Sequence, residues 1–375
     1  MKIGLICPYN VNAGGAVLEI VKDMQAGLKA RGHEVKIITP QPRDVSNVDL
    51  TDMIYLGKGT DIKSPTHTSA QVSATADTEV IDQVLEHEQF DILHFHEPWV
   101  PVLSRQILSR SKAVNIATFH AAIPETIMSR TVIRVVKPYT LSILKYLHEY
   151  TAVSDAAAEY IRSLTDEPVH IIPNGIDLTR FSWGEHKPKA RGKKTIVFLG
   201  RLERRKGVKY LLKAFKLLEM SDQNIELIIA GNGPDREKLE LLAEDLQLQN
   251  VKFLGYVADA ERFELMEHAD LFVSPAIYGE SFGIVLLEAM ATGNVIIAGN
   301  NTGYESLMEG IGQLSIVNPR DDAEFARRMA LLLNEKPLQK LFRDWSKDYV
   351  QQFSYPHIID TYEKFYKDAL KRHRS

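Results

Sequence analysis

The chain lacks the features that mark several large classes of protein. Its 375 residues contain one cysteine, Cys7, which excludes a disulfide framework and a thiolate metal cluster. No stretch approaches 18 consecutive apolar residues, so a transmembrane helix is not expected. No secretory leader is recognisable, because the first apolar run is short and ends at Pro8. We therefore expect a cytoplasmic protein whose contact with a membrane would be peripheral.

An excess of charge of either sign is also missing. The sequence has 45 basic and 49 acidic side chains, which gives a formal net charge of -4. A general nucleic-acid-binding protein would carry a clear basic excess, so nucleic acid is not an expected partner. The hydrophobic share of 45% and the charged share of 25% are typical of a globular protein, and the length suggests two domains.

Short apolar runs alternate with amphipathic helical stretches along most of the chain, a pattern typical of α/β proteins with parallel sheets. Strands of a first series are expected at residues 2–7, 34–39, 91–95, 114–119, 150–153 and 169–172. A second series is expected at residues 195–199, 225–230, 251–254, 271–274, 294–298 and 315–317. The pattern predicts two doubly wound domains and a final helix over residues 357–374.

Two stretches do not follow this alternation. Residues 41–77 are rich in Ser, Thr, Asp and Gly, and we expect them to form a loop. Residues 183–194 carry several Lys and Arg side chains between the two series, which is typical of a solvated linker.

A glycine pair, Gly14 and Gly15, follows the first predicted strand and precedes a helix. Glycine there lets backbone N–H groups approach an anion at the positive end of the helix, and an ordinary turn is the alternative. The loop does not match G-x-G-x-x-G, and the chain has no G-x-x-x-x-G-K-[ST]. A nicotinamide dehydrogenase and a P-loop nucleotide hydrolase are therefore disfavoured.

Two cationic side chains, Arg201 and Lys206, follow the first strand of the second series. Ligands of doubly wound sheets bind at the carboxyl ends of the strands. The arginine fork and the lysine point charge could therefore converge on one diphosphate, whereas a solvated charged turn is the alternative.

Two glutamates spaced E-x7-E, Glu280 and Glu288, flank the start of a predicted helix. The free N–H groups at such a start suit a phosphate, and a carboxylate beside it can accept hydrogen bonds from sugar hydroxyls. The alternative is that both glutamates are ordinary helix-capping or surface residues, but the core Gly279-Glu280-Ser281-Phe282-Gly283 makes the pattern specific.

Three histidines, His94, His96 and His120, end predicted strands. A metal pair on one strand face is conceivable for His94 and His96, but a third ligand is not obvious and no D-x-D triplet occurs. A metal is therefore not expected, and a structural role is the alternative for each histidine.

Together these motifs resemble those of the retaining glycosyltransferases of family 4. The motifs that carry the resemblance are Gly14-Gly15, His120, Pro173 to Asp177, Gly200-Arg201-Leu202, Lys206-Gly207, Gly231 to Pro234 and Gly279 to Glu288. Finer details are similar to the bacterial phosphatidylinositol α-mannosyltransferases, namely Ile6 to Tyr9, His94 to Pro98, Ala117 to His120, Ala152 to Asp155 and Gly279 to Leu286.

The resemblance implies an α/β fold of the GT-B type. Two Rossmann-like doubly wound domains would face a central cleft, and the C-terminal helix would return to the N-terminal domain. Residues 1–172 with 357–375 would bind the acceptor, and residues 173–356 would bind the sugar-nucleotide donor.

The resemblance also implies roles for individual residues. Four would act at the donor sugar and its leaving diphosphate: His120, Arg201, Lys206 and Glu280. Eight would bind the rest of the donor: Gly15, Val257, Asp259, Arg262, Phe282, Gly283, Ile284 and Glu288. The positions at the acceptor end are Tyr9, Leu18 and Trp99, where Leu18 and Trp99 replace a glutamine and an asparagine of the phosphatidylinositol enzymes.

The implied function is the metal-independent and cofactor-independent transfer of a hexose, mannose from GDP-mannose, with an α linkage. The acceptor would be a lipid or glycan such as phosphatidylinositol, met at the inner face of the plasma membrane. Two alternatives stay open, a transferase that uses a UDP-sugar on a soluble or glycolipid acceptor and a non-catalytic sugar-nucleotide binding protein. A sugar-nucleotide epimerase shares the architecture, but the Gly-Glu-Ser-Phe-Gly element favours transfer.

Overall fold

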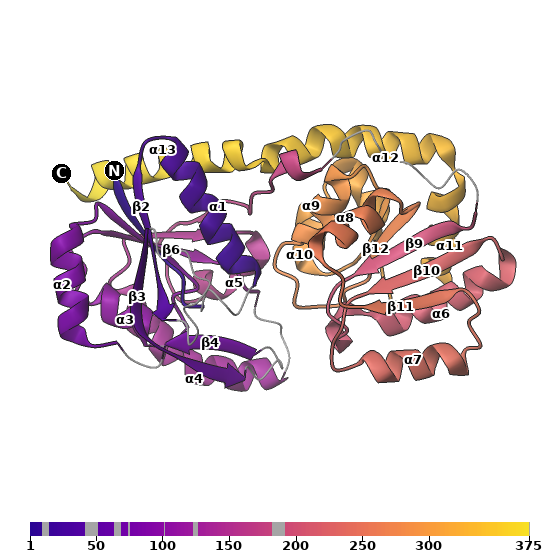
Figure 1. Cartoon of the computed structure of the whole chain (residues 1–375), viewed down its shortest axis with the longest axis horizontal. Helices are drawn as coiled ribbons and strands as arrows, with labels where there is room; N and C mark the ends of the chain where they lie inside the picture. Colours follow the sequence, from indigo (N-terminus) through magenta and orange to yellow (C-terminus); the bar gives the residue numbers. More distant parts are fainter. Residues whose placement is uncertain are drawn as a thin grey trace. The chain divides into compact units, whose positions relative to one another are not determined.

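A computed structural model describes residues 1–9, 15–41, 52–63, 69–73, 76–100, 102–122, 127–181 and 192–374. The chain forms two compact units, which Figure 1 shows with their helices and strands labelled. Unit 1 comprises Met1–Gly175 and Tyr355–Ser375, and unit 2 comprises Ile176–Ser354. Residues 183–191, the greater part of the stretch predicted as a linker, lie outside the described residues.

Unit 1 contains a sheet of order β4-β3-β2-β1-β5-β6-β7-β8. Its strands are β1 Lys2–Ile6, β2 Glu34–Gln41, β3 Met53–Lys63, β4 Ser69–Ser73, β5 Ile92–His96, β6 Val114–Phe119, β7 Glu149–Ala152 and β8 Val169–Ile171. All neighbours pair in parallel except β3 and β4. β5 and β6 are buried along their whole length, in agreement with the apolar runs that predicted them.

The loop expected over residues 41–77 is a wrong prediction, because β3 and β4 lie within it. The short apolar run from Met53 to Leu56 adds a parallel strand to β2, with Met53 opposite Ile37. β4 then closes the edge of the sheet as an antiparallel partner of β3. As an edge strand, β4 tolerates polar residues that a central strand does not. β3 is mostly polar beyond Leu56, so composition alone concealed both strands.

The helices of unit 1 are α1 Ala16–Ala30, α2 Thr78–Glu88, α3 Leu103–Leu108, α4 Ile127–Leu144, α5 Asp155–Arg162 and the C-terminal α13 Tyr355–His373. Figure 1 shows α13, in yellow, beside α1. The two helices approach closely at Gly27, where a Cβ atom would lie 2.7 Å from Cγ1 of Ile359. Tyr362 and Tyr366 of α13 are buried in the apolar core of the unit with Ile359.

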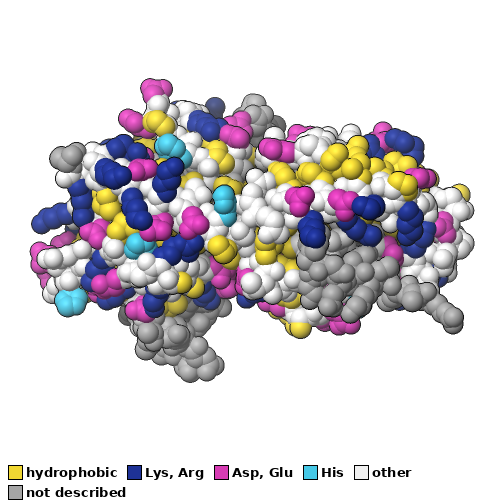
Figure 2. Space-filling model, turned by 90° about the horizontal axis from the view of Figure 1, so that it is seen from above, with side chains coloured by type: hydrophobic (Ala, Val, Ile, Leu, Met, Phe, Trp, Pro, Cys, Tyr) yellow, Lys and Arg dark blue, Asp and Glu magenta, His cyan; other side chains and the backbone are white. Residues whose placement is uncertain are grey.

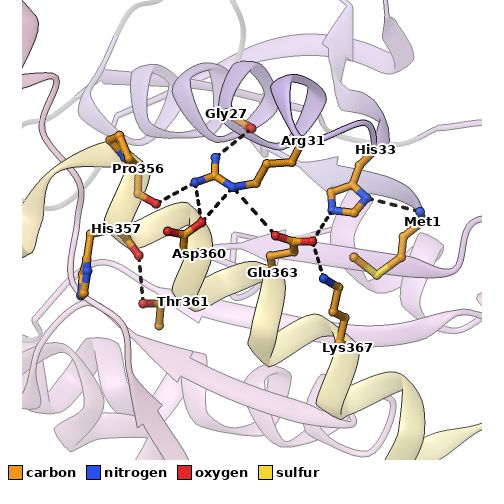
Figure 3. A network of polar contacts seen from close by, with 10 residues as sticks. All are labelled: Met1, Gly27, Arg31, His33, Pro356, His357, Asp360, Thr361, Glu363 and Lys367. Atoms are coloured by element: carbon orange, nitrogen blue, oxygen red, sulfur yellow. Dashed lines mark hydrogen bonds and ion pairs between the residues drawn. The ribbon is translucent and has the colours of Figure 1, made fainter.

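A polar network, drawn in Figure 3, fixes the rim of this contact. Arg31 donates to the Asp360 carboxylate at 2.6 Å and to the carbonyl of Pro356 at 2.8 Å. Glu363 lies between His33, at 3.3 Å, and Lys367. Thus the predicted final helix is confirmed, and it is tied to the N-terminal unit by both apolar and charged contacts.

Unit 2 contains a parallel sheet of order β11-β10-β9-β12-β13-β14, the Rossmann order. Its strands are β9 Lys194–Leu199, β10 Ile225–Ala230, β11 Val251–Gly255, β12 Leu271–Ser274, β13 Ile296–Gly299 and β14 Ile316–Val317. All twelve predicted strands are present within two residues of their expected bounds. The strand order reverses between β9 and β12, and ligands of such sheets bind at this switch point.

The helices of unit 2 are α6 Val208–Ser221, α7 Arg236–Asp245, α8 Asp259–Glu267, α9 Ile284–Ala291, α10 Thr302–Leu307, α11 Asp322–Asn334 and α12 Lys336–Tyr349. Figure 1 shows α6 and α7 on one side of the sheet and α8 and α9 on the other. Short 3-10 turns are present at Leu178–Arg180, Arg204–Lys206, Gly310–Ser315 and Val350–Phe353. No helix in the described part of the chain is long and apolar enough to cross a bilayer.

Candidate active site

A pocket of about 650 Å³ opens at the carboxyl ends of β9, β10 and β11 in unit 2. Its lining comes from the loops after these strands, with Arg262 of α8 beside them. Gly231 is required where two of these loops meet, because its φ is +139° and a Cβ atom would lie 1.9 Å from the carbonyl oxygen of Gly200. The pocket therefore lies where a doubly wound sheet binds its ligand.

Beside the switch point, five charged side chains form a continuous series of ion pairs, here called the ion-pair cluster. Its members are Arg201, Glu203, Arg205, Lys206 and Glu280. Glu203 forms an ion pair with Arg201 at 2.6 Å and accepts from Arg205 at 2.9 Å. One oxygen of Glu280 accepts from Arg205 at 2.6 Å and forms an ion pair with Lys206 at 2.8 Å.

The ion-pair cluster has three cations and two carboxylates, so its surplus charge is positive. Arg201 is half exposed and lines the pocket, which leaves it accessible to an anion. Neighbouring carboxylates raise the pKa of Arg205 despite its burial. A multiply charged anion such as a diphosphate would match this surplus.

The turn that carries Arg205 and Lys206 is held against the loop that carries Glu280. Ile277 N–H donates to the carbonyl of Arg205 at 2.8 Å. Gly207 has a φ of +73° and lies so close to Pro275 that a Cβ atom would meet the Pro275 carbonyl oxygen at 1.9 Å. These backbone contacts explain how residues 75 positions apart in sequence form one cluster.

The helix after Glu280 begins with an uncapped N-terminus. Gly283 is the N-cap of α9, with no side-chain cap, and a Cβ atom there would lie 2.9 Å from the Tyr304 ring. Phe282 is buried and packs edge-on against Phe353, so only its backbone is available to a ligand. Ile284 opens the helix. The backbone contacts predicted for residues 282–284 stay predictions, and this geometry permits them.

A second carboxylate, Glu288, lies one turn into α9 and is largely buried. One of its oxygens accepts from Arg262 at 3.2 Å, and the other forms an ion pair with the same Arg262 nitrogen at 3.1 Å. Burial raises the pKa of Glu288, and Arg262 opposes that shift. Val257 and Arg262 line the pocket, whereas Asp259 is mostly exposed and lies 3.7 Å from Arg262.

Unit 1 holds a buried histidine cluster at the carboxyl ends of β5 and β6, made up of His94, His96 and His120. His96 Nδ1 lies 2.9 Å from His120 Nε2, and the rings of His94 and His96 are 4.3 Å apart. Burial lowers the pKa of His94 to about 3 and that of His120 to about 4, so both imidazoles are neutral. His94 and His96 are fully buried.

Glu97 joins the ends of the two strands in this cluster. Its N–H donates to the carbonyl of Thr118 at 3.0 Å, and its carboxylate accepts from the backbone N–H of His120 at 2.6 Å. Glu97 has a φ of +50°, and burial raises its pKa to about 7. Within the described residues no three His, Cys, Asp or Glu side chains are placed to hold a metal ion.

The predicted acceptor residues lie in different environments. Leu18 packs in the apolar core of unit 1. Trp99 packs against Phe119 and Tyr160, with ring centroids 5.3 and 5.4 Å away. The carbonyl of Tyr9 accepts from Thr39 at 2.8 Å.

Gly15 is the N-cap of α1 with a φ of +127° and open space at its Cβ position. Gly14 lies outside the described residues.

Sequence reasoning named Arg201, Lys206 and Glu280 but missed Glu203 and Arg205. Both missed residues lie inside the basic run from Arg201 to Lys206, where Glu203 is the single acid. That isolated acid among cations was the available signal for an ion-paired turn. The bond from Arg205 to Glu280 gave no sequence signal because it joins two loops distant in sequence.

Two family models cover most of the chain. Residues 17–180 match Glycosyltransferase Family 4, and residues 180–348 match Glycosyl transferases group 1. The phosphatidyl-myo-inositol mannosyltransferase of Mycolicibacterium smegmatis is 31% identical over 86% of this chain and 82% of its own length. That of Mycobacterium leprae is 30% identical over 98% of this chain and 96% of its own length.

Solved structures agree on the fold. A glycosyltransferase from Rickettsia africae has a TM-score of 0.76 at 18% identity and covers 99% of this chain and 98% of its own. Sucrose-phosphate synthase from Thermosynechococcus elongatus has a TM-score of 0.77 at 19% identity and covers 99% of both chains.

These matches confirm the predicted GT-B fold and set aside the non-catalytic protein and the epimerase considered from the sequence. The chain belongs to the retaining glycosyltransferases of family 4.

Proposed function

We propose that this glycosyltransferase moves mannose from GDP-mannose to phosphatidylinositol with an α linkage. The observation that carries the proposal is the identity of 30–32% to phosphatidyl-myo-inositol mannosyltransferases over most of the chain. The pocket of unit 2, with the ion-pair cluster beside it, supports it as a site for a nucleoside diphosphate sugar.

Arg201 and Lys206 would stabilise the leaving diphosphate. As the anomeric bond breaks, negative charge grows on the phosphate oxygen, and fixed cations lower the energy of that state more than that of the bound substrate. Their partners Glu203 and Glu280 hold them in place beforehand. Glu280, once Lys206 turns to phosphate, would keep its bond to Arg205 and accept from donor sugar hydroxyls.

The remaining donor contacts are those that the resemblance to the family implies. Glu288, held by Arg262, would accept from the ribose hydroxyls, and Val257 and Asp259 would contact the base. The free N–H groups at Gly283 and Ile284 would meet phosphate and sugar oxygens. From unit 1, Gly15 would approach the phosphate and His120 the donor sugar.

The reaction would retain the anomeric configuration by a same-face substitution. The bond from the anomeric carbon to the diphosphate oxygen breaks, and the acceptor oxygen bonds to that carbon on the face the diphosphate leaves. The acceptor proton passes to the departing phosphate oxygen, so GDP is released. In this step the protein supplies charge stabilisation and orientation rather than a covalent nucleophile.

The donor is tested by calorimetry with GDP-, UDP- and ADP-sugars. We expect GDP-mannose to bind and UDP-glucose not to bind. The Arg201→Ala and Glu280→Ala variants are expected to lose transfer, with Arg204→Ala as the matched control because Arg204 is exposed in the same turn. Binding of UDP-glucose without GDP-mannose, or full transfer by either site variant, would overturn this part of the proposal.

The acceptor is tested with labelled GDP-mannose and phosphatidylinositol in vesicles. A labelled lipid that releases mannose and inositol on hydrolysis supports the proposal, and a labelled water-soluble product contradicts it. A lipid acceptor implies peripheral contact with the inner face of the plasma membrane from the cytoplasm. On the face shown in Figure 2, basic and acidic side chains are interspersed. We therefore expect weak, salt-sensitive flotation with vesicles.

A further inference from the structure

A series of buried polar contacts runs through unit 1 from α13 to the histidine cluster. The Tyr366 hydroxyl lies 2.6 Å from His94 Nδ1, and His94 Nε2 lies 2.6 Å from Thr118 Oγ1. His96 follows two residues after His94 on β5, packs against its ring and reaches His120 Nε2. Tyr366, His94 and His96 are fully buried.

Only one assignment of donors and acceptors fits the hydrogen bonds from Thr151 to Tyr366. Thr151 donates its hydroxyl proton to the carbonyl of Ala117 at 3.0 Å, so Thr118 must donate to Thr151 across the 2.5 Å contact. Thr118 Oγ1 then accepts from His94 Nε2–H. A neutral His94 is left with a bare Nδ1, which accepts from the Tyr366 hydroxyl. The hydrogen-bond network thus assigns the tautomer of His94 through a group on α13.

The orientation of His120 depends on the same series. Neutral His96 and His120 share one N–H···N bond, in which one ring donates and the other accepts. The His96 ring is held on its other side by the His94 ring. A change in the tilt or tautomer of His94 would therefore reach His120 through a packed contact and one hydrogen bond.

We propose that α13 supplies a positioning residue, Tyr366, which acts on His120 through His94 and His96. The inference rests on the proposed role of His120 at the donor sugar. In this proposal the C-terminal helix helps to position His120, although none of the helix residues needs to touch the substrate.

The contacts that hold α13 in unit 1 are made by residues other than Tyr366, so they do not explain why its hydroxyl is present. The rim of the helix is held by Arg31 with Asp360 and by His33 with Glu363, as Figure 3 shows. Its apolar face is held by residues such as Ile359, which packs against α1. The hydroxyl of Tyr362, one turn earlier, also bonds Thr151 and lies 3.4 Å from Thr118, where its bond is much weaker than that of Tyr366 to His94.

Three variants separate positioning from stability. Tyr366→Phe removes one oxygen, leaves His94 Nδ1 without its donor, and is expected to lower kcat about tenfold with the donor KM little changed. Tyr362→Phe is the matched control from the same helix face, and Asp360→Asn loosens the rim without touching the series. Both controls should keep kcat, even where the melting temperature falls as much as in Tyr366→Phe. A kcat loss that follows melting temperature across all three would overturn the proposal.

A spectroscopic readout makes the test independent of turnover. In protein labelled with ¹⁵N-histidine, Tyr366→Phe should change the ring nitrogen shifts of His94, His96 and His120, whereas Asp360→Asn should not. Changes confined to His94 would overturn the proposal even if the enzyme transfers mannose. Conversely, wild-type protein that fails to use GDP-mannose would remove the proposed function while the ¹⁵N shifts still test the coupling.

Discussion

The two units carry polar clusters at the ends of their parallel strands, and these clusters are built on opposite electrostatic principles. In unit 1, His94, His96 and His120 are buried and neutral, and hydrogen bonds fix their rings. In unit 2, the ion-pair cluster is charged and Arg201 is half exposed. The first cluster avoids the cost of burying charge, and the second balances charge with charge.

The difference separates two ways of preparing a site. The contacts from Tyr366 to His94, from His94 to Thr118 and between His96 and His120 hold the rings of the histidine cluster before any ligand binds. The cations of unit 2 already have carboxylate partners, so an anionic ligand must compete with Glu203 and Glu280 for them. The Arg201–Glu203 pair can exchange because Arg201 is half exposed, and ion pairs open to solvent are worth little. Lys206 and Glu280 are largely buried, but Glu280 would keep its bond to Arg205 when Lys206 turns to an anion. We infer that unit 1 contributes fixed geometry and unit 2 contributes exchangeable charge.

The largest effect expected from this comparison is the loss of an exchangeable cation. Lys206→Ala should lower kcat about 10²–10³-fold, because it removes one donor that stabilises developing charge on the leaving group. Arg205→Ala should also impair catalysis, but through Glu280, which would lose the partner that holds it when Lys206 binds phosphate. Steady-state kinetics with GDP-mannose measures both.

The control for this series is Arg204→Ala, which removes the same charge from the same turn at an exposed position. We expect its kcat within about twofold of wild type, as for a surface substitution. If Arg204→Ala matched Lys206→Ala, net charge rather than exchange at Glu280 would explain the loss, and the comparison of the two units would fail.

The fold was predictable because it depends on local sequence patterns. The apolar runs of β5 and β6 and the glycine turns after β1 and β9 are short-range signals that can be read from neighbouring residues. β4 was missed because an edge strand carries few apolar residues, and β3 because only its first residues, Met53 to Leu56, form an apolar run. Helix α12 was not predicted either, and its buried face includes the polar residues Gln339 and Ser346.

The residues of the site also differ in whether a short sequence motif contains them. Arg201, Lys206 and Glu280 lie in short motifs, so the resemblance named them. Arg205 depends on a partner 75 residues away, and Tyr366 meets His94 across 272 residues. Contacts of this kind arise from the way the sheet and α13 pack. No spacing in the sequence encodes them.

Acid pH is expected to destabilise unit 1 through its neutral histidine cluster. The folded-state pKa values of His94 and His120 lie near 3 and 4, well below the ordinary value of 6.5, and that of His96 is also strongly lowered. The unfolded chain therefore binds more protons on these rings as pH falls from about 6.5 to 4, which destabilises unit 1 by up to about 1.4 kcal/mol per histidine per pH unit. Glu97 works in the opposite sense, because its raised folded-state pKa favours the folded state as pH falls.

Tryptophan fluorescence can follow the two units separately. Trp183→Phe/Trp345→Phe keeps Trp99 of unit 1, and Trp99→Phe/Trp183→Phe keeps Trp345 of unit 2. We expect the urea midpoint reported by Trp99 to fall more steeply between pH 6.5 and 4.5 than that reported by Trp345. Adding Glu97→Gln to the Trp99 protein should steepen the fall further. Parallel curves for the two units would contradict the electrostatic contrast.

The smallest effect tests whether every ion pair of unit 2 is exchangeable. Arg262 and Glu288 pair through both carboxylate oxygens, and Glu288 is more deeply buried than a surface carboxylate. We expect Arg262→Gln to raise the donor KM about fivefold, or about 1 kcal/mol, with kcat unchanged, because a fixed pair orients Glu288 equally in the bound substrate and the transition state. Arg327→Gln, which breaks an exposed pair with Glu324 on α11, is the control and should change neither constant. A fall in kcat for Arg262→Gln would mean that this pair also rearranges during transfer, so that exchange extends beyond the ion-pair cluster.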